Sequence, residues 1–246
     1  MNAILSRGAD LAATDTLPLT REQSHHLANV LRLKAGAKLL VLNGEGASRE
    51  AGLASVSKKQ CVCEFRGGVR TLPRPEVGIT LFQCVAKPAG MDWLIEKATE
   101  LAVSRIVPVL SERTVAGANV GRWTRIAEAA ICQCGGGWLP EIADAVKWGE
   151  ALARIRGHIA DGGAVFTGAL TPGAPTLAAR MPPRSPVAFI IGPEGDLTPT
   201  EYAEAETAGA RPVTFGPQVL RVETAAIFAV CAAKTLAEFH KEKPRP

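Results

Sequence analysis

The sequence lacks any apolar run long enough to cross a membrane. Its longest apolar run near the C-terminus, AAIFAVCAA at 225–233, is about half of the roughly 18 residues that a transmembrane helix requires. The N-terminus also lacks a basic segment followed by a long apolar one, which argues against a signal peptide. We therefore expect a cytoplasmic protein without a membrane partner.

Several common site motifs are absent as well. Neither G-x-G-x-x-G nor a Walker A motif occurs, which argues against a Rossmann dinucleotide site and a P-loop. No Ser/His/Asp or Cys/His set can be assembled. Two C-x-C pairs occur, Cys61 with Cys63 and Cys132 with Cys134. Metal sites usually use C-x2-C spacing and neither pair has a histidine nearby, so we expect reduced thiols and no metal.

The overall composition is that of a globular protein. Of the 246 residues, 47% are apolar and 21% are charged, which is enough for the cores of one or two domains. The formal net charge of +4 is a mild excess that is compatible with an RNA partner without indicating one.

The first seventy residues have the pattern of a small β module. A capping box at Thr20–Gln23 predicts a helix through SHHLANVLRL that Gly36 ends. Short strands with turns at Asn43–Gly44 and Lys58–Lys59 then predict a small barrel or compact sheet. The next segment, 66–78, is rich in Gly, Pro and Arg and indicates a linker. The predicted strands are KLLVLN, REAGLASV and CVCEF.

Basic residues crowd this module. Such residues usually form only a solvated face, but a small β module is also a common platform for nucleic acid. We take four of them as the candidate RNA-binding residues: Arg7, Arg21, Arg32 and Lys34.

After residue 78 the pattern alternates between strands and helices. This alternation predicts a mostly parallel sheet with helices on both faces. A second capping box, Thr198 to Glu201 with Pro199 at the first helical position, opens one helix, and Glu223–Thr224 opens the last. The predicted strands are ITLFQCVA, RIVPVL, AVFTG, VAFII and PVTF, and the other predicted helices are MDWLIEKATELAV and RWTRIAEAAICQC.

Two of these strands end in a Gly-Pro loop, at Gly192–Pro193 and at Gly216–Pro217. Ligands of open α/β sheets bind beyond the carboxyl ends of the strands, and glycine lets the backbone approach a ligand closely. The loops also carry charged residues, Glu194 and Asp196 in the first, and Arg221 and Glu223 in the second. The residues alone leave two interpretations open, two ordinary turns or two loops that meet around one ligand.

The segments IIGPEGDLTPTE and FGPQVLRVETAA resemble the signature pair of the SPOUT methyltransferases. More narrowly, they resemble the RsmE family, the ribosomal RNA small subunit uridine N3-methyltransferases. Three other segments resemble the same family in the same order, so that the resemblance covers nearly the whole chain. These segments are HHLANVLRLKAG, MDWLIEKATELAVSRIVPVLSERTV and RWTRIAEAAICQCGGGWLPEI.

The resemblance implies an α/β fold of two domains. Residues 1–72 would form a PUA-like, RNA-binding small β-barrel, and residues 73–246 a SPOUT methyltransferase domain with a parallel sheet and a C-terminal trefoil knot. The knotted loops would bind S-adenosylmethionine and the chain would form a homodimer. The residues implied as cofactor-binding are Thr167, Gly168, Leu170, Ile191, Gly192, Pro193, Glu194, Gly195, Phe215, Gly216, Leu220 and Thr224.

The activity that the resemblance implies is methylation of uridine N3 in the 16S rRNA of the small ribosomal subunit. Deprotonated N3 leaves negative charge on O2 and O4, which Arg221 would stabilise. Glu223 would orient Arg221 by an ion pair, and Glu194 is a candidate general base, although the base itself stays unassigned.

Four residues depart from the pattern of the family. Asp196 stands where the family usually has glycine, Gln218 and Gly136 where it usually has arginine, and Cys132 where it usually has glutamate. Lost positive charges weaken RNA contacts. Two alternatives therefore stay open: a SPOUT methyltransferase for another rRNA or tRNA nucleotide, and an inactive rRNA-binding assembly factor.

Overall fold

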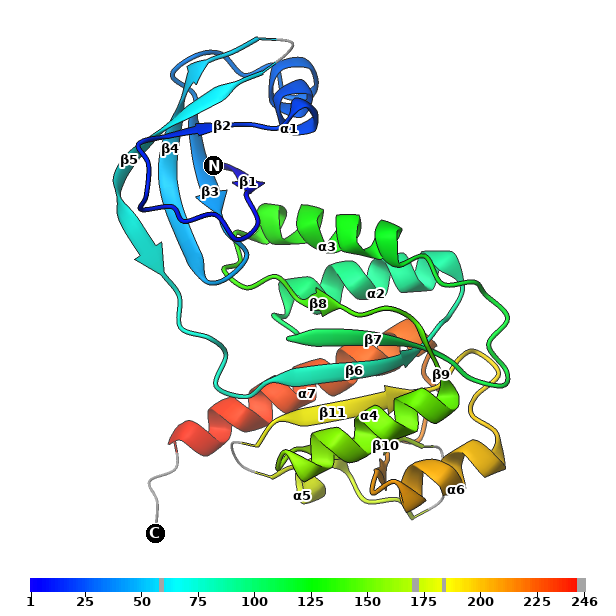
Figure 1. Cartoon of the computed structure of the whole chain (residues 1–246). Helices are drawn as coiled ribbons and strands as arrows, with labels where there is room; N and C mark the ends of the chain where they lie inside the picture. Colours follow the sequence, from blue (N-terminus) through cyan, green and yellow to red (C-terminus); the bar gives the residue numbers. More distant parts are fainter. Residues whose placement is uncertain (58–59, 170–172, 183–184, 243–246) are drawn as a thin grey trace. The chain divides into compact units, whose positions relative to one another are not determined.

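The structure is a computed structural model that describes residues 1–57, 60–169, 173–182 and 185–242, and of residues 239–242 only the backbone (Figure 1). The chain divides into two compact units. Residues 1–74 and 128–139 make up the first unit, and residues 75–127 and 140–246 belong to the second. The division falls within helix α3 (Val120–Cys134), after Ala127.

The first unit contains a five-stranded sheet with the order β1-β3-β4-β5-β2. β1 runs parallel to β3, and the other neighbouring strands are antiparallel. Leu27, Leu39, Leu53 and Cys61 are among the side chains buried in its apolar core. The elements are β1 (Asn2–Leu5), β2 (Thr16–Pro18), α1 (Arg21–His25), η1 (His26–Val30), β3 (Lys38–Leu42), β4 (Ala47–Ser55) and β5 (Val62–Thr71).

The predicted linker at 66–78 is wrong for its first part, because β5 continues through Thr71. Gly67 has a φ of 65°, and the register between β4 and β5 shifts between Ser48 and Glu50. The glycines therefore accommodate an irregularity within a paired strand.

The first helix begins as predicted and ends earlier. The Thr20 side chain accepts from the Gln23 backbone N–H, and the Gln23 side chain accepts from the Thr20 N–H, which confirms the capping box. After α1 and one π-turn, Arg32 adopts a φ of 52°. A right-handed helix cannot continue through this conformation, so the prediction that Gly36 ends the helix is wrong.

The tight turn at Asn43–Gly44 is confirmed. The Asn43 side-chain oxygen accepts from the backbone N–H of Glu45 and Ala47, and Gly44 has a φ of 78°. The turn predicted at Lys58–Lys59 lies outside the described residues.

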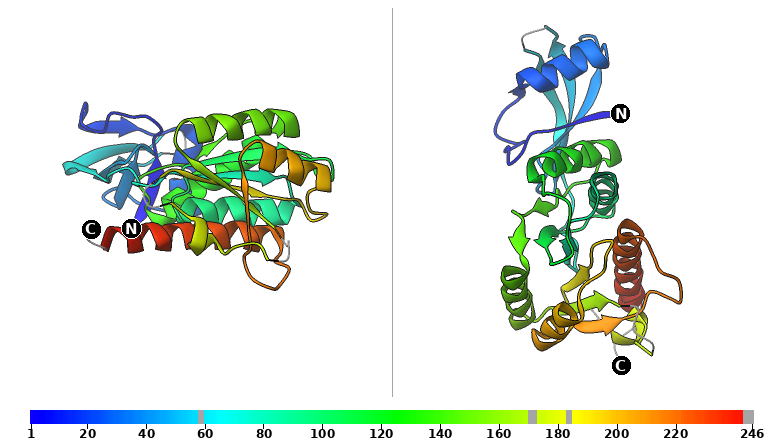
Figure 2. Two further views of the ribbon diagram at one scale, coloured as in Figure 1. Left: turned by 90° about the horizontal axis from the view of Figure 1, so that it is seen from below. Right: turned by 90° about the vertical axis from the view of Figure 1, so that its right-hand side faces the viewer.

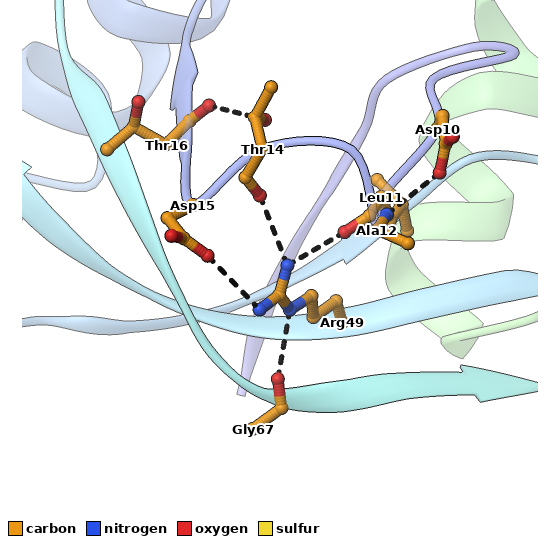
Figure 3. Close-up of polar contacts among 8 residues, drawn as sticks. All are labelled: Asp10, Leu11, Ala12, Thr14, Asp15, Thr16, Arg49 and Gly67. Atoms are coloured by element: carbon orange, nitrogen blue, oxygen red, sulfur yellow. Dashed lines mark hydrogen bonds and ion pairs between the residues drawn. The ribbon is translucent and has the colours of Figure 1, made fainter.

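Arg49 fastens the N-terminal segment to the sheet (Figure 3). Its Nη1 donates to the carbonyl oxygens of Leu11 and Thr14 at 2.9 and 3.1 Å, and its Nε donates to that of Gly67 at 3.0 Å. Its Nη2 lies 3.7 Å from Oδ1 of the exposed Asp15. Arg49 is therefore a structural cation whose Nε and Nη1 donors are already used.

The second unit is built on a parallel sheet with the order β12-β10-β11-β6-β7-β8, and β9 also pairs with β7. Helices α2 and α7 lie on one face of this sheet, and α4 and α6 lie on the other (Figure 2). Both faces are covered, and all five residues of the central strand β11 are buried, as its continuous apolar sequence predicts.

The predicted strands at 105–110, 164–168 and 187–191 are confirmed, as is the capping box at Thr198. Helix α4 and the two short strands β8 and β9 were not predicted. The elements are β6 (Ile79–Cys84), α2 (Pro88–Glu100), β7 (Arg105–Leu110), β8 (Glu141–Ile142), β9 (Val146–Lys147), α4 (Trp148–Ala160), β10 (Ala164–Gly168), α5 (Leu177–Arg180), β11 (Val187–Ile191), α6 (Pro199–Thr207), β12 (Arg211–Val213) and α7 (Val222–Glu242).

Candidate functional site

A cavity of about 610 Å³ lies beyond the carboxyl ends of β6, β10, β11 and β12. This volume is typical of sites for small molecules and cofactors. The two Gly-Pro loops meet around it, so they are two walls of one cavity. The predicted residues that line it are Gly168, Ile191, Gly192, Pro193, Glu194, Phe215, Gly216, Leu220, Arg221 and Glu223.

Three predicted site residues that the structure describes do not belong to this lining. Thr167 is buried and its Oγ1 has no hydrogen-bond partner among the described residues. Gly195 is exposed in the first loop, and Thr224 is exposed on α7. Leu170 lies outside the described residues.

The cavity also contains residues that we did not predict. Lys87, Ala89 and Gly90 come from the start of α2, directly after the buried strand β6. Because β6 pairs with β11, the rule that ligands bind beyond strand ends could have identified them. The other unpredicted lining residues are Ala169, Asp196, Tyr202, Gln218, Val219, Val222 and Ala225.

The first Gly-Pro loop is fixed by contacts on two sides. Glu194 Oε1 accepts from the backbone N–H of Lys87 at 2.8 Å, which connects the loop to the start of α2. Arg113 Nη1 donates to the carbonyl oxygen of Gly195 at 2.8 Å, from the loop that follows β7. Glu194 therefore already has a partner that positions its wall of the cavity.

Arg221 and Glu223 come from the second loop and the first turn of α7. The predicted ion pair between them is not formed, so this prediction is wrong; within the described residues the Arg221 side chain has no hydrogen-bond or ion-pair partner. Glu223 instead lies beside the first turn of α2, where a Cβ added to Gly90 would be 3.3 Å from Glu223 Oε2. A carboxylate is favourable at a helix N-terminus, which explains why Glu223 lies beside α2 and not beside Arg221. Arg221 is exposed and free to contact a substrate.

Glycines make room along the walls of the cavity. A Cβ at Gly168 would lie 2.6 Å from the Phe215 ring, and one at Gly192 would lie 3.2 Å from the Leu197 backbone nitrogen. Two buried polar atoms near these strand ends, Thr167 Oγ1 and Gln83 Oε1, lack partners among the described residues. The glycine and apolar lining fits a small-molecule ligand that approaches the backbone closely.

Glu201, which is only 4% exposed, joins the loops next to the cavity. Its Oε1 accepts from the Glu112 N–H at 2.8 Å, and its Oε2 from the Thr198 N–H at 2.9 Å. Replacing Glu201 with alanine leaves both donors unpaired, so we expect the free energy of unfolding to fall by about 2–4 kcal/mol. Urea denaturation measures this change.

The matched control for that prediction is Glu206→Ala, on the exposed side of the same helix α6. An exposed substitution of this kind should change stability by less than about 0.5 kcal/mol. Equal losses in the two variants would show that the buried carboxylate does not stabilise the loops.

The predicted RNA-binding residues belong to the first unit. Arg21, Arg32 and Lys34 are exposed and make no side-chain ion pair within the described part of the chain. Arg7 differs, because its Nε lies 3.1 Å from Glu128 Oε1. Three of the four cations are therefore available for phosphate groups.

The described thiols and histidines do not gather into a group that could hold a metal. Within the described residues, no three His, Cys, Asp or Glu side chains are placed to bind a metal. Burial raises the pKa of Cys63 to about 11 and that of Cys132 to about 11, so both thiols are protonated at neutral pH. Cys132 therefore carries no charge. In the same part of the structure, no helix is both long and apolar enough to cross a bilayer.

Family models match both parts of the chain. An RNA methyltransferase domain matches residues 73–234, and an RNA methyltransferase PUA domain matches residues 19–66. The first unit is accordingly a PUA-like half-barrel, and the second is the parallel α/β sheet of the SPOUT methyltransferases.

Several named relatives match this chain over almost its whole length. The ribosomal RNA small subunit methyltransferase E of Synechocystis is 30% identical over 91% of this chain and 74% of its own length. The protein of that name from Mycobacterium tuberculosis is 30% identical over 93% of this chain and 92% of its own. A crystal structure of the Neisseria gonorrhoeae protein of that name, bound to S-adenosylmethionine, superposes with a TM-score of 0.87 at 28% identity. The superposition covers 96% of this chain and 98% of the Neisseria gonorrhoeae chain. The chain belongs to the ribosomal RNA small subunit methyltransferase E family.

Proposed function

We propose that this protein methylates N3 of a uridine in the 16S rRNA of the small ribosomal subunit, with S-adenosylmethionine as the methyl donor. The observation that carries this proposal is the cavity in which both Gly-Pro loops meet beside the unpaired Arg221. Named relatives are small subunit rRNA methyltransferases, and one was solved with S-adenosylmethionine bound.

The cofactor fits the residues that are present. The backbone of Gly168, Gly192 and Gly216 would contact it, and the apolar walls at Leu220 and Phe215 would take its adenine ring. Ile191, Pro193 and Glu194 also line the cavity and would contact the cofactor. Thr167, Leu170, Gly195 and Thr224 stay predicted cofactor residues, although the cavity lining does not include Thr167, Gly195 or Thr224. The bound cofactor supplies an electrophilic methyl group on a sulfonium centre.

The chain itself has to prepare the nucleophile. N3 must lose its proton before it attacks, and the resulting negative charge spreads over O2 and O4 of the uracil. Arg221, which has no partner in the described chain and lines the cavity, would stabilise this charge. The walls of the cavity would hold the cofactor and the uridine in the orientation that methyl transfer requires.

The two carboxylates take different parts in this proposal. Glu194 can act as the general base only if its Oε2 reaches N3, since its Oε1 accepts from Lys87. Glu223 contributes by its place beside the first turn of α2, which leaves Arg221 free.

We assign RNA binding to residues 1–72 and catalysis to residues 73–246. Arg21, Arg32 and Lys34 would contact phosphates, and Arg7 would contribute when it leaves Glu128. Because the substrate is ribosomal, the site of action would be the cytoplasm.

The proposed assembly is a homodimer whose C-terminal segment forms a trefoil knot. Phe228 on α7 is 45% exposed and Val219 in the second loop is 77% exposed, which gives apolar surface beside the cavity for a second copy. Light scattering of the purified protein tests the dimer, and a mass equal to one chain would exclude it. Tracing residues 164–246 in an electron-density map tests the knot.

Nucleoside mass spectrometry tests the activity. We expect 3-methyluridine after the protein acts on unmodified small subunits with S-adenosylmethionine. A different methylated base would replace the substrate assignment with another rRNA or tRNA nucleotide. Failure to bind S-adenosylmethionine would favour an inactive assembly factor.

A further inference from the structure

Asp196 has an unusual backbone conformation at the edge of the cavity. Its φ of 63° is one of three positive values at non-glycine positions in the described chain. A Cβ is unfavourable in this left-handed region, where glycine is the residue that costs least. The backbone N–H of Asp196 donates to the Pro193 carbonyl oxygen at 2.9 Å, which closes a tight turn.

The Asp196 carboxylate offsets this strain with specific hydrogen bonds. Its Oδ1 accepts from the backbone N–H of Leu197 and from the Tyr202 hydroxyl, both at 2.8 Å. Short polar side chains such as aspartate tolerate the left-handed region because they make such local bonds. A Cβ at Gly192 would lie 3.2 Å from the same Oδ1, so the carboxylate sits over the first glycine of the loop.

Tyr202 connects this loop to a second wall. It is the single tyrosine in the sequence, and it reaches the cavity from α6. Its one hydroxyl proton is shared between Asp196 Oδ1 at 2.8 Å and, as the longer contact, the carbonyl oxygen of Gly168 at 3.4 Å, at the end of β10. Burial and the neighbouring Asp196 raise the pKa of Tyr202, so the hydroxyl stays protonated and remains a donor.

We infer that Asp196 and Tyr202 are a pair of positioning residues for the methyl-transfer site. Together they set the separation between the Gly168 wall and the Gly192 wall, and thereby the position of the cofactor relative to Arg221. This inference rests on the proposed function.

A double-mutant cycle tests the pair, with Tyr202→Phe, Asp196→Gly and the combination of both. The dissociation constant of S-adenosylmethionine is measured by calorimetry, and kcat and KM for 3-methyluridine formation are measured on small subunits. Each single variant should weaken cofactor binding or lower kcat roughly tenfold, because a hydrogen bond to a charged group is lost. The double variant should bind the cofactor no more weakly, and have a kcat no lower, than the more impaired of the two single variants.

Conservative and control variants separate positioning from folding. Asp196→Asn should recover most of the binding, because asparagine also tolerates the left-handed region and its amide oxygen can accept from Tyr202. Thr207→Ala is the matched control, since Thr207 on α6 makes an exposed hydrogen bond to Ala203 and does not line the cavity. It should leave binding and kcat unchanged.

Two results would overturn the inference. Additive losses in the double variant would show that the residues act independently. A lower unfolding temperature with unchanged cofactor binding, kcat and KM would show a purely structural role. A wild-type protein that neither binds the cofactor nor methylates RNA would instead reject the proposed function, and the inference with it.

Discussion

Replacing Arg221 with alanine is expected to lower kcat by a factor on the order of 10²–10³, the usual effect of removing a group that stabilises transition-state charge. Arg221 lines the cavity, and its guanidinium has no partner in the described chain, so its loss should leave the fold intact. Cofactor binding should change by less than about threefold. Single-turnover methylation and calorimetry measure the two quantities.

Arg156→Ala provides the matched control, because Arg156 is an exposed arginine of α4 that does not line the cavity. Arg221→Lys should restore only part of the rate, since an ammonium lacks the forked donors that could bridge two oxygens. A raised KM with unchanged kcat would mean that Arg221 binds substrate and transition state equally, and would remove it from the chemical step.

Replacing Arg21, Arg32 and Lys34 together with alanine should weaken binding to small-subunit RNA by a factor on the order of 10² at low salt. The slope of log affinity against log salt should become shallower by about 2, because each lost contact with single-stranded RNA releases about 0.7 fewer counterions. Cofactor binding should not change. Filter binding across a salt series measures both values.

The control variant replaces three cations of the second unit with alanine: Lys147, Arg156 and Arg180. All three are exposed and do not line the cavity. An equal loss of RNA affinity in this control would show that net charge, and not Arg21, Arg32 and Lys34 in particular, determines RNA binding. Substitutions are preferable to deletion of residues 1–72, because residues 128–139 belong to the same unit and would lose their partners. The Leu139 N–H donates to the Gly44 carbonyl oxygen, and the Gly46 N–H donates to the Gly137 carbonyl oxygen.

Local patterns were enough for much of the secondary structure and for the main walls of the site. The capping boxes at Thr20 and Thr198 and the apolar run of β11 depend on neighbours in the sequence, and the structure contains all three. The Gly-Pro loops were identified because both follow predicted strands of one sheet. Ten predicted residues accordingly line one cavity.

Predictions that depended on distant partners were less successful. The strand through Arg66–Thr71 exists because β4 pairs with it, although its glycines suggested a linker. The Arg221–Glu223 ion pair was implied by the family resemblance, yet Glu223 lies beside Gly90, which is far away in the sequence. Local spacing could not reveal either neighbour.

The sequence by itself determined the alternation of strands and helices, the two Gly-Pro loops and the family to which they point. Only the tertiary structure decided which loops face each other, since that depends on the strand order β12-β10-β11-β6. The same order brings Lys87 to the cavity and Tyr202 to Gly168 at the end of β10. Hydrogen bonds and ion pairs form between groups that the fold brings within a few ångströms, and sequence separation does not encode that distance.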